Sequence, residues 1–425
     1  MTSSPGARPA SLVREGGVEV GIRAFHDEGV YREELEKIFA KCWLFLGHES
    51  QLGRSGDYLS TRMGEDEVVV TRTKDGRLRA FLNSCRHRGP KLCRADQGNS
   101  QALRCPYHGW TYDLDGNLVG VPRLKTAYHG EFDRSAIKLV EVAHLDTVHG
   151  LIFATWDPDA PSLAEYLGDF LPYLDLMLGR GRSAAGFEAV GGVHKWTIET
   201  NWKIPAENFS GDQYHLSSTH ASSVEVGLRN RVTEYGHTVH VEGGHGFTRE
   251  KGGAQQGTAA VTGYTEHVRK VQERIGAQNP ELVEFVPVGV GSIFPNLSFM
   301  DGMRFLTLRQ WQPRGPHLID VNSWCLVDSA LSGELKDAAM RQYVLAFGPS
   351  GMFEQDDGEI WTSISEATRG VVAQRHSFDY TMGLGHEVSV KDHTGVDLPG
   401  VMGESFITEG NQRSFYRRWR QLMEK

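Results

Sequence analysis

Two cysteine–histidine pairs stand close together in the chain at spacings that suit a metal centre. Cys85 and His87 are separated by one residue, and Cys105 and His108 by two. Thiolate and imidazole are ligands for both zinc and iron–sulfur centres. The residue types therefore predict a metal site and leave a structural zinc site and an iron–sulfur cluster as alternatives. Cys93 stands between the pairs, has no place in this pattern, and is expected to be a buried free thiol.

A second possible metal site combines two distant segments. Asp212, His215 and His220 lie in one of them, but residues five apart on a regular helix point about 140° apart, so the helix must be distorted if both rings are to reach one ion. Asp356 and Asp357 stand at the start of a predicted apolar helix, where carboxylates are costly to bury unless they pair or bind something. Two histidines and one carboxylate form the facial triad of non-haem Fe(II) oxygenases. The alternative for one of the two aspartates is a charge that the helix dipole favours.

The chain that must position these residues has 425 residues, 45 basic and 54 acidic side chains, and a net charge of −9. This balance argues against nucleic-acid binding, which requires a basic face. The longest apolar stretch, around residues 150–156, is too short to span a bilayer. Five cysteines are too few for a disulfide scaffold, and the N-terminal segment lacks the apolar core of a secretory signal. Composition therefore predicts a soluble, cytoplasmic protein that contacts neither nucleic acid nor a membrane.

The hydrophobic pattern predicts different elements in the two halves of the chain. Apolar residues at helical spacing predict a helix over 31–45, and β-rich runs that meet at Asp75-Gly76 and at Asp115-Gly116 predict two hairpins. Ser162 and Glu165 form a capping box for a helix that extends to residue 178. The later runs are grouped rather than alternating, which favours an α+β fold. Strands are expected over 193–199, 304–313 and 317–327, and helices over 333–347 and 413–425.

These elements predict a domain organisation in three parts. Residues 1–41 form a tail and a helix that pack with the larger domain. Residues 42–160 form a small antiparallel β domain, and residues 161–425 form the larger domain. The first possible metal site then belongs to the small domain and the second to the larger one.

The loops CRHRG and CPYHGWTYDLDGNLVG resemble the binding loops of Rieske [2Fe–2S] domains. From about residue 31 to its C-terminus, the chain resembles the large (α) subunits of Rieske non-haem iron aromatic-ring-hydroxylating dioxygenases. This resemblance implies a small antiparallel β Rieske domain and a catalytic domain whose antiparallel sheet is packed by helices, similar to a helix-grip fold. Carried over by position, it assigns the cluster to Cys85, His87, Cys105 and His108, and the mononuclear iron to His215, His220 and Asp357.

The same resemblance identifies other residues near the iron. Asp212 matches the acidic residue that links an iron histidine to a cluster histidine of a neighbouring subunit, and Asn208 matches a residue near the iron that is usually not a tight ligand. The substrate pocket is expected to contain Phe209, Gln213, Leu216, Phe353, Phe294, Asn296 and Leu297. The last three, in the strand IFPNLSF, are ordinary core residues in the alternative interpretation. This mostly apolar set suits a polycyclic or biaryl hydrocarbon, and Gln213 is a polar exception that could contact a substituent.

Enzymes similar to this chain take electrons from NAD(P)H through a separate reductase and a ferredoxin, and the chain has no GxGxxG fingerprint of its own. They add both atoms of O2 to an aromatic ring as a cis-dihydrodiol. The resemblance also implies a small β subunit in an α3β3 assembly. The alternatives are a monooxygenase or O-demethylase on the same scaffold, an aromatic-acid dioxygenase, and a zinc-stabilised binding protein without catalysis.

Overall fold

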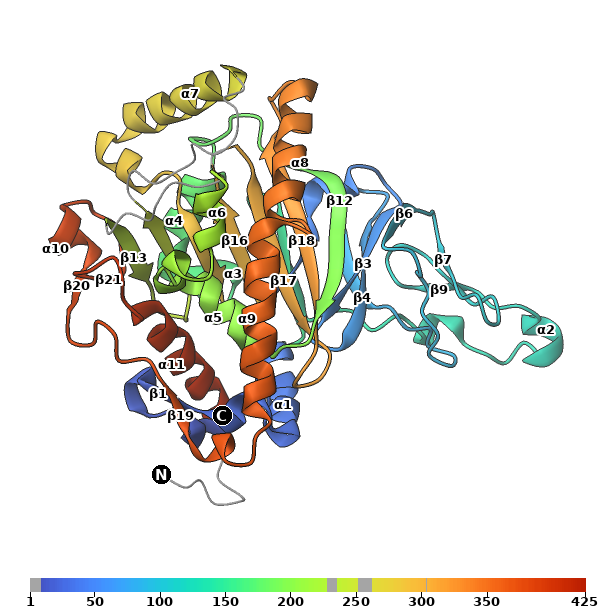
Figure 1. The fold of residues 1–425 in the computed structure, drawn as a ribbon. Coiled ribbons are helices and arrows are strands. Elements are labelled where there is room, and N and C mark those ends of the chain that lie inside the picture. The colour runs from blue at the N-terminus through green and yellow to red at the C-terminus, as the bar shows by residue number, and fades with distance from the viewer. Residues whose placement is uncertain (1–8, 228–234, 251–261, 303) are drawn as a thin grey trace. The chain divides into compact units, whose positions relative to one another are not determined.

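The computed structural model describes residues 9–227, 235–250, 262–302 and 304–425, and the chain divides into two compact units. One unit combines Met1–Ile38 with Ala164–Lys425, and the other is Phe39–Leu163. Antiparallel sheets form the framework of both units, and long helices join the sheet of the larger one, so the predicted α+β class is confirmed (Figure 1). The limits drawn at residues 42 and 160 stay predictions, and the first eight residues of the predicted tail lie outside the described residues.

The larger unit is built on one antiparallel sheet, which has nine strands in the described part of the chain. The strand β17 (Leu306–Pro313) is buried over its whole length between β16 (Leu297–Asp301) and β18 (Ile319–Asp328). Burial on both faces removes the alternation of apolar and polar residues that a half-exposed strand shows. The remaining strands are β12 (Phe187–Ile198), β15 (Gly289–Ile293), β14 (Gly246–Glu250), β13 (Gly236–His240), β21 (Val401–Gly403) and β20 (Glu387–Ser389).

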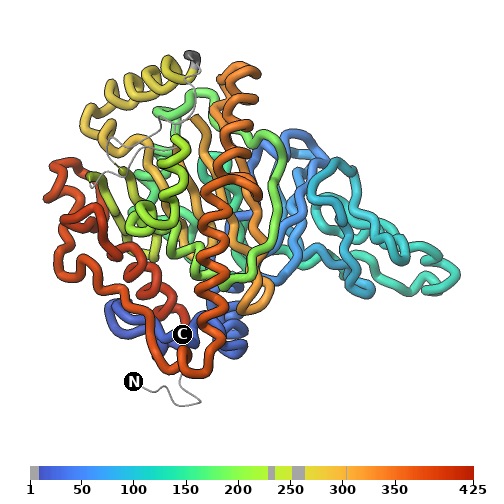
Figure 2. The backbone as a smooth tube through the Cα atoms, in the orientation of Figure 1, coloured from blue at the N-terminus to red at the C-terminus, as the bar shows by residue number. Residues whose placement is uncertain are grey.

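Several helices pack on this sheet. The short helix α5 (Lys203–Gly211) contacts β14, β15, β16 and the C-terminal helix α11 (Gly410–Glu424). The helix α8 (Gly333–Phe347) begins where the Ser332 side chain accepts the N–H of Leu335, and α9 (Met352–Thr368) follows it. Within this unit the N-terminal segment runs along α11, as Figure 2 shows. No helix among the described residues combines the length and the apolar character that a bilayer-spanning segment needs.

Three sequence-based expectations need correction. The helix predicted over 31–45 is instead α1 (Glu28–Glu34) followed by a π-helical turn, and its last residues form the buried strand β2 (Leu44–His48), which pairs with β11 (Leu151–Thr155). The apolar run that looked helical is therefore a strand buried by tertiary pairing. The helix predicted to extend to 178 is divided into α3 (Leu163–Leu167) and α4 (Leu171–Leu178) by a 3-10 turn.

The segment IFPNLSF is the turn between β15 and β16 rather than one strand, with Ile293 and Leu297 as register partners. Proline has no N–H to donate to a strand ladder, which explains why the chain turns at Pro295. Elsewhere in the larger unit the predicted strands and helices correspond to β12, β17, β18, α8 and α11.

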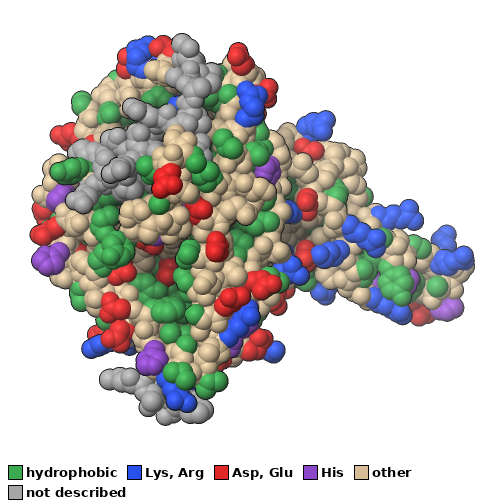
Figure 3. All heavy atoms as spheres, in the orientation of Figure 1, with side chains coloured by type: hydrophobic (Ala, Val, Ile, Leu, Met, Phe, Trp, Pro, Cys, Tyr) green, Lys and Arg blue, Asp and Glu red, His purple; other side chains and the backbone are tan. Residues whose placement is uncertain are grey.

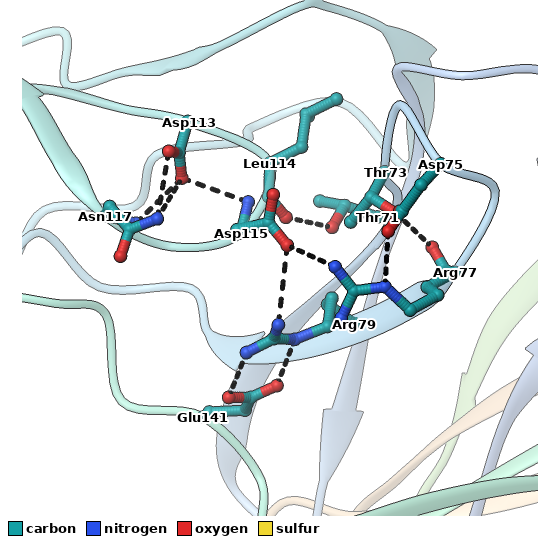
Figure 4. A network of polar contacts seen from close by, with 10 residues as sticks. All are labelled: Thr71, Thr73, Asp75, Arg77, Arg79, Asp113, Leu114, Asp115, Asn117 and Glu141. Carbon is teal, nitrogen blue, oxygen red and sulfur yellow. Dashed lines mark hydrogen bonds and ion pairs between the residues drawn. The ribbon is translucent and has the colours of Figure 1, made fainter.

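The two predicted hairpins of the smaller unit are confirmed. One joins β4 (Asp66–Arg72) to β5 (Leu78–Leu82), and the other joins β8 (Thr111–Tyr112) to β9 (Leu118–Gly120). Figure 4 shows the ion pairs that tie their turns together: Arg77 lies 2.6 Å from Asp75 and 3.2 Å from Asp115. Arg79 also reaches Asp115 and pairs with Glu141. The unit is completed by β3 (Asp57–Met63), β6 (Gln97–Asn99), β7 (Leu103–Arg104) and β10 (His144–Val148).

A buried ion pair anchors the start of α5. The Lys203 Nζ lies 2.6 Å from the Glu34 Oε1, and neither side chain is exposed. The indole N–H groups of Trp202 and Trp419 both donate to the Glu34 carboxylate at 2.8 Å. Burial lowers the pKa of Lys203, and the charge and hydrogen bond of Glu34 partly offset this effect. The pair therefore joins α1, α5 and α11 at one point.

Removal of one partner should destabilise the larger unit strongly. We expect Glu34→Gln to lower the free energy of unfolding by about 3–5 kcal/mol, because Lys203 is left as an unpaired buried charge. The double variant Glu34→Gln/Lys203→Met should recover most of this loss. Urea denaturation followed by tryptophan fluorescence measures both, and a double variant as unstable as Glu34→Gln alone would contradict the assignment.

Candidate metal centres

The two cysteine loops of the smaller unit have the same backbone geometry. In each loop the cysteine N–H donates to the carbonyl five residues later, at 3.0 Å for Cys85 and 2.7 Å for Cys105. In each loop the N–H of a glycine four residues on donates back to the cysteine carbonyl. These glycines, Gly89 and Gly109, have φ values of 83° and 73°, which a side chain would disfavour. The chain thus presents two matching turns, each with a buried cysteine at its start.

The histidines of these loops lie against each other. The ring centroids of His87 and His108 are 4.6 Å apart, and His87 stacks on Trp110 at 4.8 Å. Burial raises the pKa of the Cys85 thiol, and the neighbouring Cys105 thiol acts in the same direction. Two buried thiols become thiolates together only when a cation compensates their charge. The donor set therefore suits a positively charged metal centre.

The arrangement of these four donors separates the two alternatives for the centre. Among the described residues, one group of at least three His, Cys, Asp or Glu side chains has its ligand atoms within 4.8 Å of one another, and this group lies in the larger unit. The two cysteines and two histidines of the smaller unit do not form such a group. A structural zinc ion needs four donors around one point. A Rieske cluster instead needs a cysteine pair on one iron and a histidine pair on the other. The four donors fit the two-iron cluster and not a single zinc ion.

The sequence interpretation missed Tyr112, which lies beside this centre. Its hydroxyl is 3.5 Å from the Cys85 Sγ and accepts the N–H of Arg86 at 3.1 Å. A tyrosine two residues after Trp110 was the available signal, but nothing in the spacing indicates which way its ring turns. Cys93 is buried and free, as predicted, and burial raises its pKa to about 12.

On the face of the smaller unit that Figure 3 shows, Lys and Arg side chains gather.

The second site forms where a helix ends. The helix α5 stops at Gly211, and Asp212 leaves helical geometry with φ −78° and ψ 96°. His215 then lies in a 3-10 turn over Tyr214–Ser217, and His220 directly precedes α6 (Ala221–Glu225). This break is the distortion that the spacing of the two histidines requires. Their Nε2 atoms are 3.2 Å apart.

A carboxylate from α9 completes a triangle of ligand atoms. The Asp357 Oδ1 lies 3.5 Å from the His215 Nε2 and 3.3 Å from the His220 Nε2. Atoms bound to one ion at about 2.1 Å lie about 3.0 Å apart at right angles and about 3.4 Å apart in a tetrahedron. The observed triangle therefore fits one metal ion, with three protein ligands on one side of it.

Each of the two histidines has a second carboxylate on its other ring nitrogen. The Asp212 Oδ2 lies 3.3 Å from the His215 Nδ1, and the Asp356 Oδ2 lies 3.2 Å from the His220 Nδ1. Consecutive residues on a helix point about 100° apart, which lets Asp356 and Asp357 reach opposite sides of the same ring. A carboxylate on the outer nitrogen fixes the tautomer and the orientation of a ligating histidine.

The protonation of Asp212 and His215 is coupled. Burial alone would raise the pKa of Asp212, but the hydrogen bond and charge of His215 outweigh burial and lower it. Burial alone would lower the pKa of His215, and Asp212 reverses this effect in the same way. Asn208 donates to the Asp212 Oδ2 at 3.3 Å. At neutral pH, Asp212 is therefore a charged acceptor held in place from two sides.

A cavity of about 250 Å³ opens beside these ligand atoms. The structure places four of the expected pocket residues on its wall, namely Phe209, Gln213, Leu216 and Phe353. It does not bring Phe294, Asn296 and Leu297 there, so their assignment to the pocket is corrected. Phe294 packs against Phe415 with ring centroids 5.0 Å apart, and the Asn296 amide donates to the Trp311 carbonyl. Phe294 and Asn296 lie in the β15–β16 turn and Leu297 begins β16, and all three belong to the core.

The sequence interpretation missed the opposite wall. It comes from β14, β15, β16 and α8, which contribute Val290, Met300, Leu345 and Phe347, and from Phe305 in the loop before β17. In a buried strand, the hydrophobic pattern of the sequence does not distinguish residues that face a cavity from residues that face the core. The tertiary structure is therefore needed to identify the residues of this wall. Arg249 also lines the cavity, whereas Arg309 is fully buried in an ion pair with Glu354.

Comparisons with known proteins match each of the two regions of the chain that contain these sites. Residues 187–425 match the family described as "Ring hydroxylating alpha subunit (catalytic domain)", and residues 42–142 match the family described as "Rieske [2Fe-2S] domain". The biphenyl 2,3-dioxygenase subunit alpha of Rhodococcus jostii (strain RHA1) is 39% identical, over 97% of this chain and 91% of that protein. The N,N-dimethyl phenylurea N-demethylase subunit alpha of Sphingobium sp. (strain YBL2) is 34% identical, over 95% and 92%. A crystal structure of a naphthalene 1,2-dioxygenase variant bound to phenanthrene matches with a TM-score of 0.91 and 32% identity, covering 97% of this chain and 94% of that one.

The Tyr112 hydroxyl should raise the reduction potential of a cluster held by Cys85. We expect Tyr112→Phe to lower the potential by about 40 mV, because one hydrogen bond is worth about 1 kcal/mol and a tenfold change is about 59 mV for one electron. The matched control is Tyr107→Phe, since Tyr107 is 61% exposed. Redox titration of the visible spectrum measures both, and equal potentials for the two variants would contradict the role of Tyr112.

The adjacent aspartates of α9 should differ in their effect on the mononuclear metal. We expect Asp357→Ala to lose iron from this site while the visible spectrum of the cluster is kept. Asp356→Asn should still bind iron but release it about tenfold faster to a chelator, because loss of an outer hydrogen bond weakens metal binding about 10–100-fold. Iron analysis and the rate of chelation test this. Iron loss from Asp356→Asn and retention by Asp357→Ala would reverse the assignment.

Proposed function

The chain belongs to the family of Rieske ring-hydroxylating oxygenase α subunits, and from this premise we propose which residues perform each task. The enzyme is a Rieske non-haem iron oxygenase whose cofactors are a [2Fe–2S] cluster and a mononuclear iron, and its dioxygenase relatives support cis-dihydroxylation of an aromatic ring as its reaction. The observation that carries the residue assignments is the triangle of His215, His220 and Asp357 beside an apolar cavity.

The cluster ligands in this proposal are Cys85, His87, Cys105 and His108. Two observations support it. The two cysteines begin matching turns, and the four ligand atoms are not gathered around one point as a single metal ion would need. The bound cluster supplies one electron at a time. The turns hold both cysteines in the buried interior of the unit, while the imidazoles of the two histidines are less deeply buried.

The iron ligands in this proposal are His215, His220 and Asp357. Bound iron at this position supplies the activation of dioxygen, because three protein ligands on one side leave the other side open. Asp356 keeps the imidazole of His220 oriented toward the ion by a hydrogen bond to its outer nitrogen, and the Asp212 carboxylate lies within ion-pair distance of the outer nitrogen of His215. Phe209, Leu216, Phe353 and the strand residues opposite them exclude water and hold a flat apolar ring.

We assign Asp212 a second task, the connection to the cluster of a neighbouring subunit. Its side chain is 32% exposed and therefore reaches solvent on one side. On the other side it lies 3.3 Å from the proposed iron ligand His215, which lowers its pKa. Asn208 keeps the carboxylate in this position. The connection requires an assembly in which subunits contact one another, and an α3β3 ring with a small β subunit meets this requirement.

The enzyme is a terminal oxygenase and depends on other proteins for its electrons. The proposed donors are a reductase that oxidises NAD(P)H and a ferredoxin. The proposed location is the cytoplasm, where NAD(P)H is available and where the five free cysteines of the chain stay reduced.

The proposed substrate is an aromatic compound with one or two apolar rings. The relatives that act on biphenyl and naphthalene support this class, and so does the cavity wall, which is largely apolar. A second candidate is oxidative N-demethylation, which the 34% identity to a phenylurea N-demethylase α subunit supports. The two candidates differ in how many atoms of O2 enter the product.

Turnover with heavy-isotope dioxygen decides between these candidates. With a surrogate ferredoxin and reductase and with biphenyl, naphthalene and a dimethyl phenylurea as substrates, we expect a dihydrodiol that carries two labelled oxygens, because both atoms of O2 enter the ring. Mass spectrometry of the product measures this. A hydroxylated product with one label, or an unlabelled demethylated urea formed together with formaldehyde, would instead assign monooxygenation.

A further inference from the structure

Gln213 is buried in the cavity wall without a hydrogen-bond partner. Its residue is 7% exposed, and it lines the cavity directly after Asp212. Its carboxamide makes no side-chain hydrogen bond to any residue that the structure describes. Its amide atoms are not among the fully buried polar atoms without a partner in the described part of the chain, so the carboxamide faces the open space of the cavity. The group is therefore available to a molecule that enters the cavity.

The other uncharged polar side chains of the wall are already engaged. Asn208 donates to Asp212, and Gln342 accepts from Arg304 at 3.2 Å. Thr248 shares a hydrogen bond of 3.0 Å with a threonine of β13. Among these residues, Gln213 is the one whose side chain makes no hydrogen bond to the described part of the protein.

From this observation we propose that Gln213 selects aromatic substrates whose ring carries a neutral hydrogen-bonding substituent, such as a hydroxyl or carbonyl group. The proposal rests on the proposed function and specifies its substrate class. A carboxamide both donates and accepts, so it satisfies a hydroxyl or a carbonyl equally well. An unsubstituted hydrocarbon leaves the amide without a partner and displaces the water that would otherwise bind it.

The position of Gln213 decides which part of the substrate it meets. Consecutive Cα atoms are about 3.8 Å apart, so the Cα atoms of Gln213 and His215 lie within about 7.6 Å of each other. Both residues line the same cavity. A substituent bonded to Gln213 is therefore close to the ring edge that faces the iron ligands, and it orients that edge.

The surroundings favour a neutral substituent over an ionised one. Asp212 precedes Gln213 in the chain, and Glu250 and Asp301 also line the cavity. Asp301 is paired with Arg182 at 2.6 Å, and Arg249 is the one basic side chain of the wall among the described residues. A carboxylate next to Asp212 would be repelled, and an ammonium group would lose its hydration against the phenyl rings of the wall.

The proposal is tested by ligand binding to the oxidised enzyme, in which no turnover takes place. The probes are biphenyl, the three hydroxybiphenyl isomers and biphenyl-2-carboxylate. The variants are Gln213→Met, which keeps the length of the side chain, and the control Gln272→Met, at an exposed residue of α7 (Thr262–Gln278) outside the cavity wall. We expect wild type to bind at least one hydroxybiphenyl about tenfold more tightly than biphenyl, which is the value of one net hydrogen bond. Gln213→Met should lose this preference, and Gln272→Met should keep it.

The outcomes separate this inference from the proposed function. The role of Gln213 would be overturned if wild type did not prefer a hydroxybiphenyl, or if Gln213→Met kept the same preference as wild type. In either case, turnover of biphenyl or of a hydroxybiphenyl would still uphold the proposed function. Tighter binding of biphenyl-2-carboxylate than of any hydroxybiphenyl would overturn the choice of a neutral substituent. A wild-type protein with full iron and sulfide content that oxidises no aromatic probe would overturn the proposed function, and this inference with it.

Discussion

Two histidines five residues apart reach one ion only because α5 ends between Ser210 and Asp212, and much of the larger unit serves to fix that end. The Asn411 amide of α11 donates to the carbonyls of Ser210 and Phe247, which holds the last turn of α5 against the sheet. A Cβ atom at Gly211 would lie 2.5 Å from this amide, so only glycine lets the two helices approach so closely. The start of α5 is fixed equally firmly by the buried pair of Lys203 and Glu34. The nine residues of α5 are therefore fixed at both ends, and the loop that follows begins at a defined point.

The acidic groups around this helix are divided between charged and neutral states. Asp212 stays charged because His215 compensates it. Glu207, on the same helix, is partly buried, and this burial raises its pKa to about 8, while the nearby Asp212 and Glu409 act in the same direction. The Tyr380 hydroxyl donates to the Glu207 carboxyl at about 3 Å. At neutral pH, Glu207 therefore keeps a proton, and Asp212 is left as the ionised carboxylate of α5 next to the metal ligands.

The residues proposed as ligands could be selected from the sequence because their chemistry limits the choices, whereas the walls of the cavity could not. Cysteine and histidine at short spacings suit few tasks, and the Asp-Gly dipeptides mark turns that depend on local conformation alone. The stretch around Leu44 and Phe45 was misjudged because an apolar run has no intrinsic preference between a buried helix and a buried strand. Its state depends on β11, which lies a hundred residues further along the chain. The different roles of Asp356 and Asp357 likewise follow from the rotation of α9 relative to His220, which only tertiary packing determines.

Metal binding and substrate choice therefore rest on different parts of the larger unit. The ligands and their outer carboxylates come from α9 and from the loop after α5, which the buried anchors hold. The opposite wall comes from β14, β15, β16 and α8, where Val290, Met300 and Leu345 contribute no group to the metal site. A substitution in this wall changes the shape offered to a substrate while the metal geometry is kept. Gln213 belongs to the other group, because it lies between Asp212 and His215 and cannot move independently of them. A polar contact from this position fixes the substrate directly against the metal site, and the apolar wall then decides how large the rest of the molecule can be.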